Sequence, residues 1–292
     1  MVPFLLIISQ KFYRDPMKGA RYGFYWNYKT LPYWSMLDYD PYRMLLRERL
    51  LVKLKEPGYS FAFISPDTLI TSGEGACHFY IISEKGTAIE KGNLPGCNRK
   101  TWIASIPLPF VTLTEVIVPE GKEVRSYELE GFKVEKDTVI RYDHPVISCW
   151  LMEEVTCALD TGVYRGATDV SLLDRDENVT LITYPWGIRL MRGEDTVVSI
   201  RTPSEPMDYS YSHGLLHVAL GSHGILTVDI HTGAHTYYRD IPAVGVYSSY
   251  GKFVVLAEDL EGCIHIFRPV FRPPSVEYVG RAETTFCQRA SR

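Results

Sequence analysis

Five of the eight histidines fall within one short stretch of the sequence, and they are the first residues that could do chemistry. They are His213, His217, His223, His231 and His235. Imidazole is the commonest metal ligand in proteins and titrates near neutral pH, so such a group suggests a metal or acid–base site. However, His217 is expected within a strand, and His223 and His231 at opposite ends of the next strand. Because these side chains cannot all converge, we expect histidines bonded to the backbone of turns and hairpins, with no metal site and no cofactor.

Neighbouring carboxylates are the second candidate, because two of them can act as general acid and base. Three acidic groups lie in expected hairpin turns: Asp174–Glu177, Glu153–Glu154 and Glu258–Asp259. The first of them lacks the glycine and the distal glutamate of an EF-hand loop. The sequence also contains no Gly-x-Ser-x-Gly nucleophile motif and no phosphate-binding loop. We therefore expect no catalytic residues in these motifs, and a hydrolase site assembled from distant segments stays an alternative.

The charge of the chain is uneven. The net charge is −4, but residues 1–57 hold ten Lys or Arg against five Asp or Glu, and the remainder is strongly acidic. Cations bind phosphates and aromatic rings can stack on unpaired bases, so the basic, aromatic segment 11–29 is a candidate nucleic-acid or partner-binding site. In the alternative interpretation, the aromatic residues are strand core and the cations form a solvated face. The candidate residues are Lys11, Arg14, Lys18, Arg21, Tyr25, Trp26 and Lys29.

The six cysteines show no metal-site spacing. They are Cys77, Cys97, Cys149, Cys157, Cys263 and Cys287. No Cys-x-x-Cys pair occurs, and no Cys–His spacing fits a zinc site. Cys149 and Cys157 flank a short turn, so they either form a disulfide across a hairpin or pack as two free thiols.

Asparagine and glutamine are scarce: the chain contains four Asn and two Gln. Depletion of these thermolabile residues is a trait of hyperthermophiles, whose intracellular proteins also tolerate disulfides. The composition therefore indicates a hyperthermophilic archaeal host or a virus of one. The apolar start of the chain has no basic region before it and is too short for a signal peptide, and no run is long enough to cross a membrane. We expect a cytoplasmic protein.

Hydrophobic residues alternate with a period of two along most of the chain, which indicates β-strands. Pro41–Glu56 has some helix propensity, but the alternation from Leu50 to Leu54 favours a strand there. The strands group in fours, separated by turns rich in Gly, Asp and Pro. After an atypical first unit in residues 1–57, the predicted units are Tyr59–Lys91, Trp102–Lys136, Thr138–Gly166, Asp169–Arg201, Met207–Arg239 and Val244–Val279.

One hairpin carries a family resemblance. The stretch from Val218 to Gly233 (VALGSHGILTVDIHTG) resembles the inner hairpin of WD40-like propeller repeats, and 257–267 is a looser copy. The resemblance covers residues 169–280 best, and no Trp-Asp dipeptide ends the third strands. It implies an all-β propeller of four-stranded antiparallel blades, with residues 1–292 in a single domain. Seven blades are favoured, and six blades plus an N-terminal extension are the alternative.

The function expected from this fold is that of a non-catalytic scaffold in a protein or ribonucleoprotein complex. This expectation rests on analogy at the level of the fold and on the lack of a catalytic motif. Three alternatives stay open: nucleic-acid binding through residues 11–29, a hydrolase site at the mouth of the propeller channel, and a structural component of a virus. We expect no membrane partner.

Overall fold

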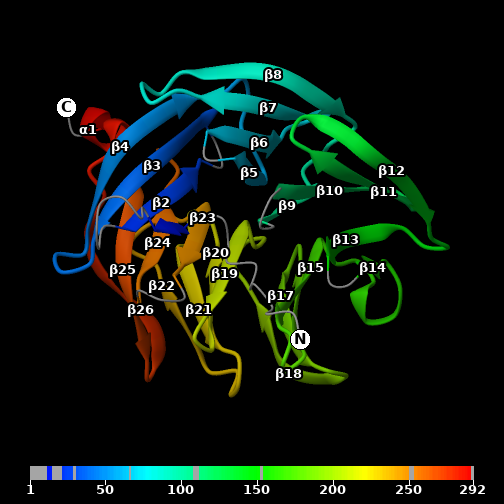
Figure 1. Ribbon diagram of the computed structural model, residues 1–292. Helices are drawn as coiled ribbons and strands as arrows, with labels where there is room; N and C mark the ends of the chain where they lie inside the picture. The colour runs from blue at the N-terminus through cyan, green and yellow to red at the C-terminus, as the bar shows by residue number, and fades with distance from the viewer. Residues whose placement is uncertain are drawn as a thin grey trace. The chain divides into compact units, whose positions relative to one another are not determined.

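The regular elements of the described residues are β-strands, apart from two short helices. The computed structural model describes residues 12–14, 22–28, 31–65, 67–107, 112–151, 154–249 and 253–290. The strands form six four-stranded antiparallel sheets and one two-stranded hairpin (Figure 1). In each four-stranded sheet the neighbouring strands are consecutive in sequence, which is the pattern of a propeller blade. The chain is therefore an all-β propeller of four-stranded antiparallel blades, and its contacts divide it into two compact units.

The first unit comprises residues 1–38 and 49–159. It contains the sheets β1–β4, β5–β8 and β9–β12 and the hairpin β13–β14, although the outer hairpin of the first sheet extends into the second unit. The strands are β1 (Phe12–Arg14), β2 (Tyr22–Asn27), β3 (Tyr33–Asp40), β4 (Leu45–Lys53), β5 (Phe61–Ser65), β6 (Thr68–Ser72), β7 (Ala76–Ile82), β8 (Ala88–Pro95), β9 (Trp102–Pro107), β10 (Thr112–Glu120), β11 (Glu123–Glu130), β12 (Lys133–Arg141), β13 (Val146–Leu151) and β14 (Val155–Leu159).

The second unit comprises residues 39–48 and 160–292. It contains three complete sheets in sequence order, β15–β18, β19–β22 and β23–β26, with a 3-10 helix (Gly162–Tyr164) before them and the helix α1 (Thr285–Ala290) after them. The strands are β15 (Asp169–Asp174), β16 (Val179–Tyr184), β17 (Gly187–Arg192), β18 (Asp195–Arg201), β19 (Asp208–Ser212), β20 (Leu215–Ala219), β21 (Ile225–Asp229), β22 (His235–Tyr238), β23 (Gly245–Ser248), β24 (Val255–Glu258), β25 (Ile264–Phe271) and β26 (Pro274–Arg281).

The middle strands of the second unit are buried on both faces. In β20 every residue is buried, and its side chains alternate between two apolar clusters. Leu216 and Val218 pack with the β15–β18 sheet, whereas Ala219 packs with the β23–β26 sheet. Because side chains of a strand alternate between its faces, this division means that the sheets stack face to face, as blades do. The outer strand β22 is partly or fully exposed.

Aspartate side chains close several of the strand turns. The Oδ1 atoms of Asp40, Asp174 and Asp229 each accept hydrogen bonds from the backbone N–H groups two and three residues further on. Short polar side chains favour turns through such local bonds. The Pro41–Glu56 segment follows the first of these turns and forms β4, so the alternation in the sequence outweighs its helix propensity.

The preference for seven blades is wrong, because the described residues form six four-stranded sheets. The first 57 residues supply a complete sheet, β1–β4, and the segment Thr138–Gly166 is the incomplete unit. Its expected first strand belongs to β12, which pairs with β11 as far as Arg141. Its expected fourth strand is replaced by the 3-10 helix, where Gly162 adopts a φ of 53°. Only the hairpin β13–β14 remains.

Disulfides and a terminal contact reinforce the two units. The structure joins Cys149 to Cys157 across the β13–β14 hairpin, and forms two further bonds. Those bonds are Cys77–Cys97 and Cys263–Cys287. In the second unit, Arg47 in the outer hairpin of the first sheet pairs with Glu283 at 2.9 Å, just before α1. No helix among the described residues is long and apolar enough to cross a bilayer.

Candidate partner-binding surface

Most of the cations predicted to bind nucleic acid lie outside the described residues. These are Lys11, Lys18, Arg21 and Lys29. Arg14 lies on β1. The two aromatic candidates on β2 are buried: Tyr25 is 8% exposed and stacks on Trp34 at 5.2 Å, and Trp26 is 1% exposed. Their rings are core residues, as the alternative interpretation expected, and a role for the cations stays a prediction.

The five clustered histidines take different positions, and His223 is exposed in the turn between β20 and β21. His217 is fully buried in β20, where its Nδ1 lies 3.1 Å from Thr227 Oγ1. His235 bonds to the backbone oxygen of Gly233, whereas His231 and His213 enter two separate surface clusters described below. Within the described ranges, no group of His, Cys, Asp and Glu side chains is arranged to hold a metal ion.

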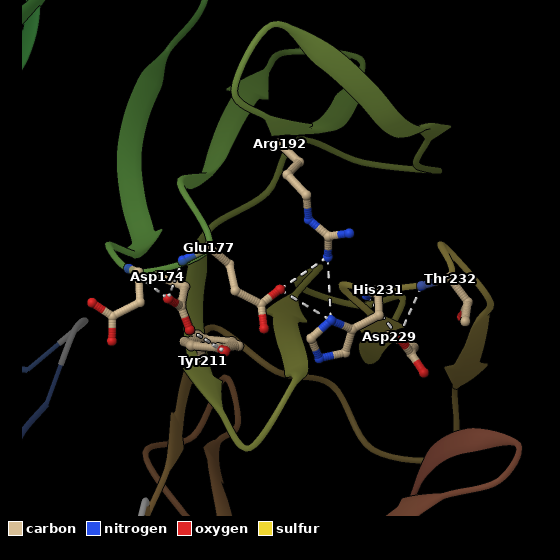
Figure 2. Close-up of polar contacts among 8 residues, drawn as sticks. Asp174, Glu177, Arg192, Tyr211, Asp229, His231 and Thr232 are labelled. Carbon is tan, nitrogen blue, oxygen red and sulfur yellow. Dashed lines mark hydrogen bonds and ion pairs between the residues drawn. The ribbon is translucent and has the colours of Figure 1, made fainter.

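Three charged or titratable side chains meet at the ends of two blades in the second unit. Figure 2 shows Glu177, Arg192 and His231 pointing toward one another. Arg192 Nη2 donates to Glu177 Oε2 at 3.1 Å and lies 3.2 Å from His231 Nδ1, which is itself 3.2 Å from Glu177 Oε2. The side chains are 41–48% exposed. His231 Nδ1 can therefore accept from Arg192 when unprotonated or donate to Glu177 when protonated.

Turn geometry explains this meeting. Asp174 Oδ1 fixes the β15–β16 turn by accepting from the N–H of Glu177 at 3.0 Å, and Asp229 Oδ1 fixes the β21–β22 turn by accepting from the N–H of His231 at 2.8 Å. Arg192 ends β17 beside the first of these turns. Each functional side chain is thus held by a turn whose backbone is already hydrogen-bonded.

Exposed aromatic rings form a second cluster at neighbouring turns. His213 stacks on Phe253 with ring centroids 4.7 Å apart, and Phe253 meets Phe271 edge-on at 6.4 Å. Phe253 is 54% exposed and Phe271 is 41% exposed. His213 and Phe253 both have a φ of 50°, which is unfavourable for bulky side chains. Strained backbone of this kind concentrates at functional sites.

The two clusters are neighbours through Gly214. A Cβ atom on this residue would lie 3.0 Å from His231 Nε2, and the Gly214 carbonyl accepts from the N–H of Ile230. Glycine at this position, with a φ of 78°, lets the His213 turn approach the His231 turn. We call the combined feature the turn-end surface. It consists of Glu177, Arg192, His213, His231, Phe253 and Phe271.

Polar side chains also link the first strands of adjacent blades, near the strand ends opposite the turn-end surface. Tyr209 donates to Asp169 Oδ2 at 2.7 Å, and Asp208 Oδ2 accepts from the N–H of Val246 at 3.0 Å. Burial, together with the nearby Asp169 charge, raises the pKa of Tyr209 well above its ordinary value, so the hydroxyl stays protonated and able to donate. These bonds hold the three blades of the second unit in a fixed relation.

A separate polar cluster lies in the first unit. The His78 ring is almost fully buried; its Nδ1 lies 2.7 Å from Glu90 Oε1, and its Nε2 contacts Glu56 Oε1. The hydrogen bond from His78 lowers the pKa of Glu90. Gly73 leaves room for the Glu56 carboxylate, since a Cβ there would lie 2.5 Å from it. With both ring nitrogens engaged, this cluster suits a structural ion network better than proton transfer.

No family model matches the chain, and no curated protein matches it. The sequence placed Glu177 only in an acidic turn and did not point to Arg192, Phe253 and Phe271, although a signal for Arg192 was present. Arg192 and His231 lie 39 residues apart, close to one repeat, so they occupy equivalent turns of adjacent blades.

Proposed function

We propose that this protein is a non-catalytic propeller scaffold that binds a macromolecular partner through the turn-end surface. The observation that carries the proposal is the exposed ring cluster around Phe253, held at a strained backbone position beside a charged cluster. Aromatic residues provide most of the binding free energy at many interfaces, and polar groups around them exclude water and set specificity. Because several blades contribute to the turn-end surface, it suits a partner large enough to contact all of them.

Rigid placement supports this role. The turns that carry the surface belong to blades joined by side-chain hydrogen bonds such as Tyr209–Asp169 and Ser248–Ser210. A preorganised surface loses little conformational entropy when a partner binds, which favours affinity. A rigid surface of this kind fits the role of a scaffold.

The WD40-like resemblance and the cytoplasmic, hyperthermophilic setting belong to the same proposal. The stretch Val218–Gly233 forms the end of β20, all of β21 and the following turn, which supports the resemblance. All six cysteines are paired in the structure. Disulfides occur inside hyperthermophilic cells, so this pairing is compatible with a cytoplasmic location.

The test is affinity purification of the tagged full chain from its native host, after nuclease treatment. Phe253→Asn removes the ring and places a residue that tolerates positive φ, so the fold should be retained. Leu260→Asn is the matched control, because Leu260 is 53% exposed in a different turn of the same sheet. We expect a nuclease-resistant partner with the wild-type chain and with Leu260→Asn, and its loss with Phe253→Asn.

Two outcomes would overturn this proposal. If Phe253→Asn retains all partners, the turn-end surface is not their binding site. Loss of all partners on nuclease treatment would instead favour the nucleic-acid alternative, for which replacement of Arg14, Lys18 and Arg21 is the next experiment.

A further inference from the structure

The turn-end surface has an acidic border on one side. Asp176, Glu194 and Asp195 are exposed, and their carboxylates make no ion pair with any described residue. They lie in the β15–β16 and β17–β18 turns, which are joined by the hydrogen bond from the N–H of Gly193 to the carbonyl of Asn178. This border therefore lies directly beside the Glu177–Arg192 pair.

The cations of the same two turns do not cancel these charges. Arg175 and Arg192 stand against five carboxylates, those of Asp174, Asp176, Glu177, Glu194 and Asp195. Arg192 is engaged by Glu177, and Glu177 also approaches His231. Further along the surface, the side chains of Phe253 and Phe271 are partly exposed to solvent. A ligand that covers the whole surface meets excess negative charge at one side and exposed aromatic rings at the other.

We propose that the partner of the turn-end surface is a protein segment rich in Lys and Arg that also carries bulky apolar side chains. This inference rests on the proposed function and adds the chemistry of the partner. Lys and Arg side chains complement the carboxylates of Asp176, Glu194 and Asp195. Their cationic groups also bind the faces of aromatic rings, and their aliphatic stems pack on such rings. Apolar side chains of the segment cover Phe253 and Phe271.

The same charges disfavour nucleic acid at this place. Phosphates would approach three exposed carboxylates, and the two arginines of these turns, Arg175 and Arg192, are outnumbered by carboxylates. A polyanion binds where cations are in excess, and here they are not. Single-stranded RNA is therefore the competing ligand that the experiment must include.

The experiment selects ligands from a random peptide library on the immobilised wild-type chain, with counter-selection on Phe253→Asn. Enriched peptides are then measured by fluorescence anisotropy at low and high salt. We expect enrichment of peptides with net positive charge and apolar residues. The double reversal Glu194→Lys/Asp195→Lys should weaken their binding about tenfold, and added salt should do the same.

Matched controls separate local from general charge effects. Glu261→Lys reverses an exposed charge in the β24–β25 turn, and Leu260→Asn removes an exposed apolar side chain there. Both should change affinity by less than about twofold, since surface substitutions away from a binding site have small effects. An RNA oligonucleotide should neither bind this surface nor compete with the peptides.

Several results would overturn the inference. Enriched peptides of neutral or negative charge, or affinity unchanged in the double reversal, would leave the scaffold function intact and refute a basic partner. Displacement of the peptides by RNA would refute it as well. If no enriched peptide binds the wild-type chain more tightly than Phe253→Asn, both this inference and the proposed function are refuted.

Discussion

His217 makes the stability of this protein depend on pH in a way that can be calculated. The side chain is fully buried in β20, its Nδ1 bonds to Thr227 Oγ1, and its Nε2 has no partner among the described residues. Burial lowers the pKa of His217 from 6.5 to about 3. In the unfolded chain the same residue titrates near its ordinary value of about 6.5.

The sign and size follow from proton linkage. Between the two pKa values the unfolded chain binds a proton that the folded chain does not, so stability falls as the pH falls below the unfolded value. From about pH 7 to about pH 5, this residue alone should lower the free energy of unfolding by about 2 kcal/mol. The loss approaches its limit only near the folded pKa of about 3.

The variant His217→Leu/Thr227→Val tests this reasoning. Replacing both hydrogen-bonding partners by apolar groups avoids leaving a buried hydroxyl unpaired, so stability near pH 7 should change little. Urea unfolding of the variant near pH 5 should then show about 2 kcal/mol less acid destabilisation than the wild type. His235→Gln, at an exposed position of the same sheet, should keep the wild-type dependence. Equal acid destabilisation in the wild type and the double variant would refute the argument.

Two further predictions concern the first unit. Glu90→Gln should lower stability by about 1 kcal/mol near neutral pH, because the bond from His78 is charge-assisted but the Glu90 side chain is 31% exposed. Since folding lowers the pKa of Glu90, its contribution is present above the ordinary value of 4.5 and is lost as the pH falls below it, so urea unfolding of the two proteins should converge in acid. Cys149→Ser/Cys157→Ser should lower the free energy of unfolding by about 2–3 kcal/mol, because the bond closes a short loop. An unfolding midpoint equal to that of the oxidised wild type would contradict this.

Much of the blade structure could be predicted because local signals agree there. In the second unit, strands such as Val179–Tyr184 combine β-branched residues with turns closed by Asp or Gly, so propensity, alternation and turn chemistry point to the same elements. The incomplete unit shows the limit of this reasoning. Thr138–Tyr142 has the composition of a separate strand, but its alternation also continues β12, and pairing with β11 decides between the two.

The candidate site was harder to predict because its residues have ordinary types. The sequence around Phe253 predicts an apolar strand residue. Only the structure shows that Phe253 has a positive φ and that its ring is exposed. Conversely, Tyr25 and Trp26 belong to a segment that suggests stacking with bases, yet both side chains are buried. Exposure depends on which face packs against the next sheet, and a strand with apolar residues on both faces leaves that open.

Residues one repeat apart in the sequence are spatial neighbours in the second unit, and this has a consequence for recognition. Contacts between adjacent blades join residues separated by 38–40 positions, as in Asp208–Val246, Arg192–His231 and Tyr209–Asp169. Each blade of the second unit therefore contributes two side chains to the turn-end surface, and the order of the blades sets the order of these side chains along it. A partner that reads this order must extend across several blades. The binding free energy is then shared among several turns, so a substitution in one turn should lower the affinity for the partner. A change of specificity to another partner requires substitutions in at least two turns.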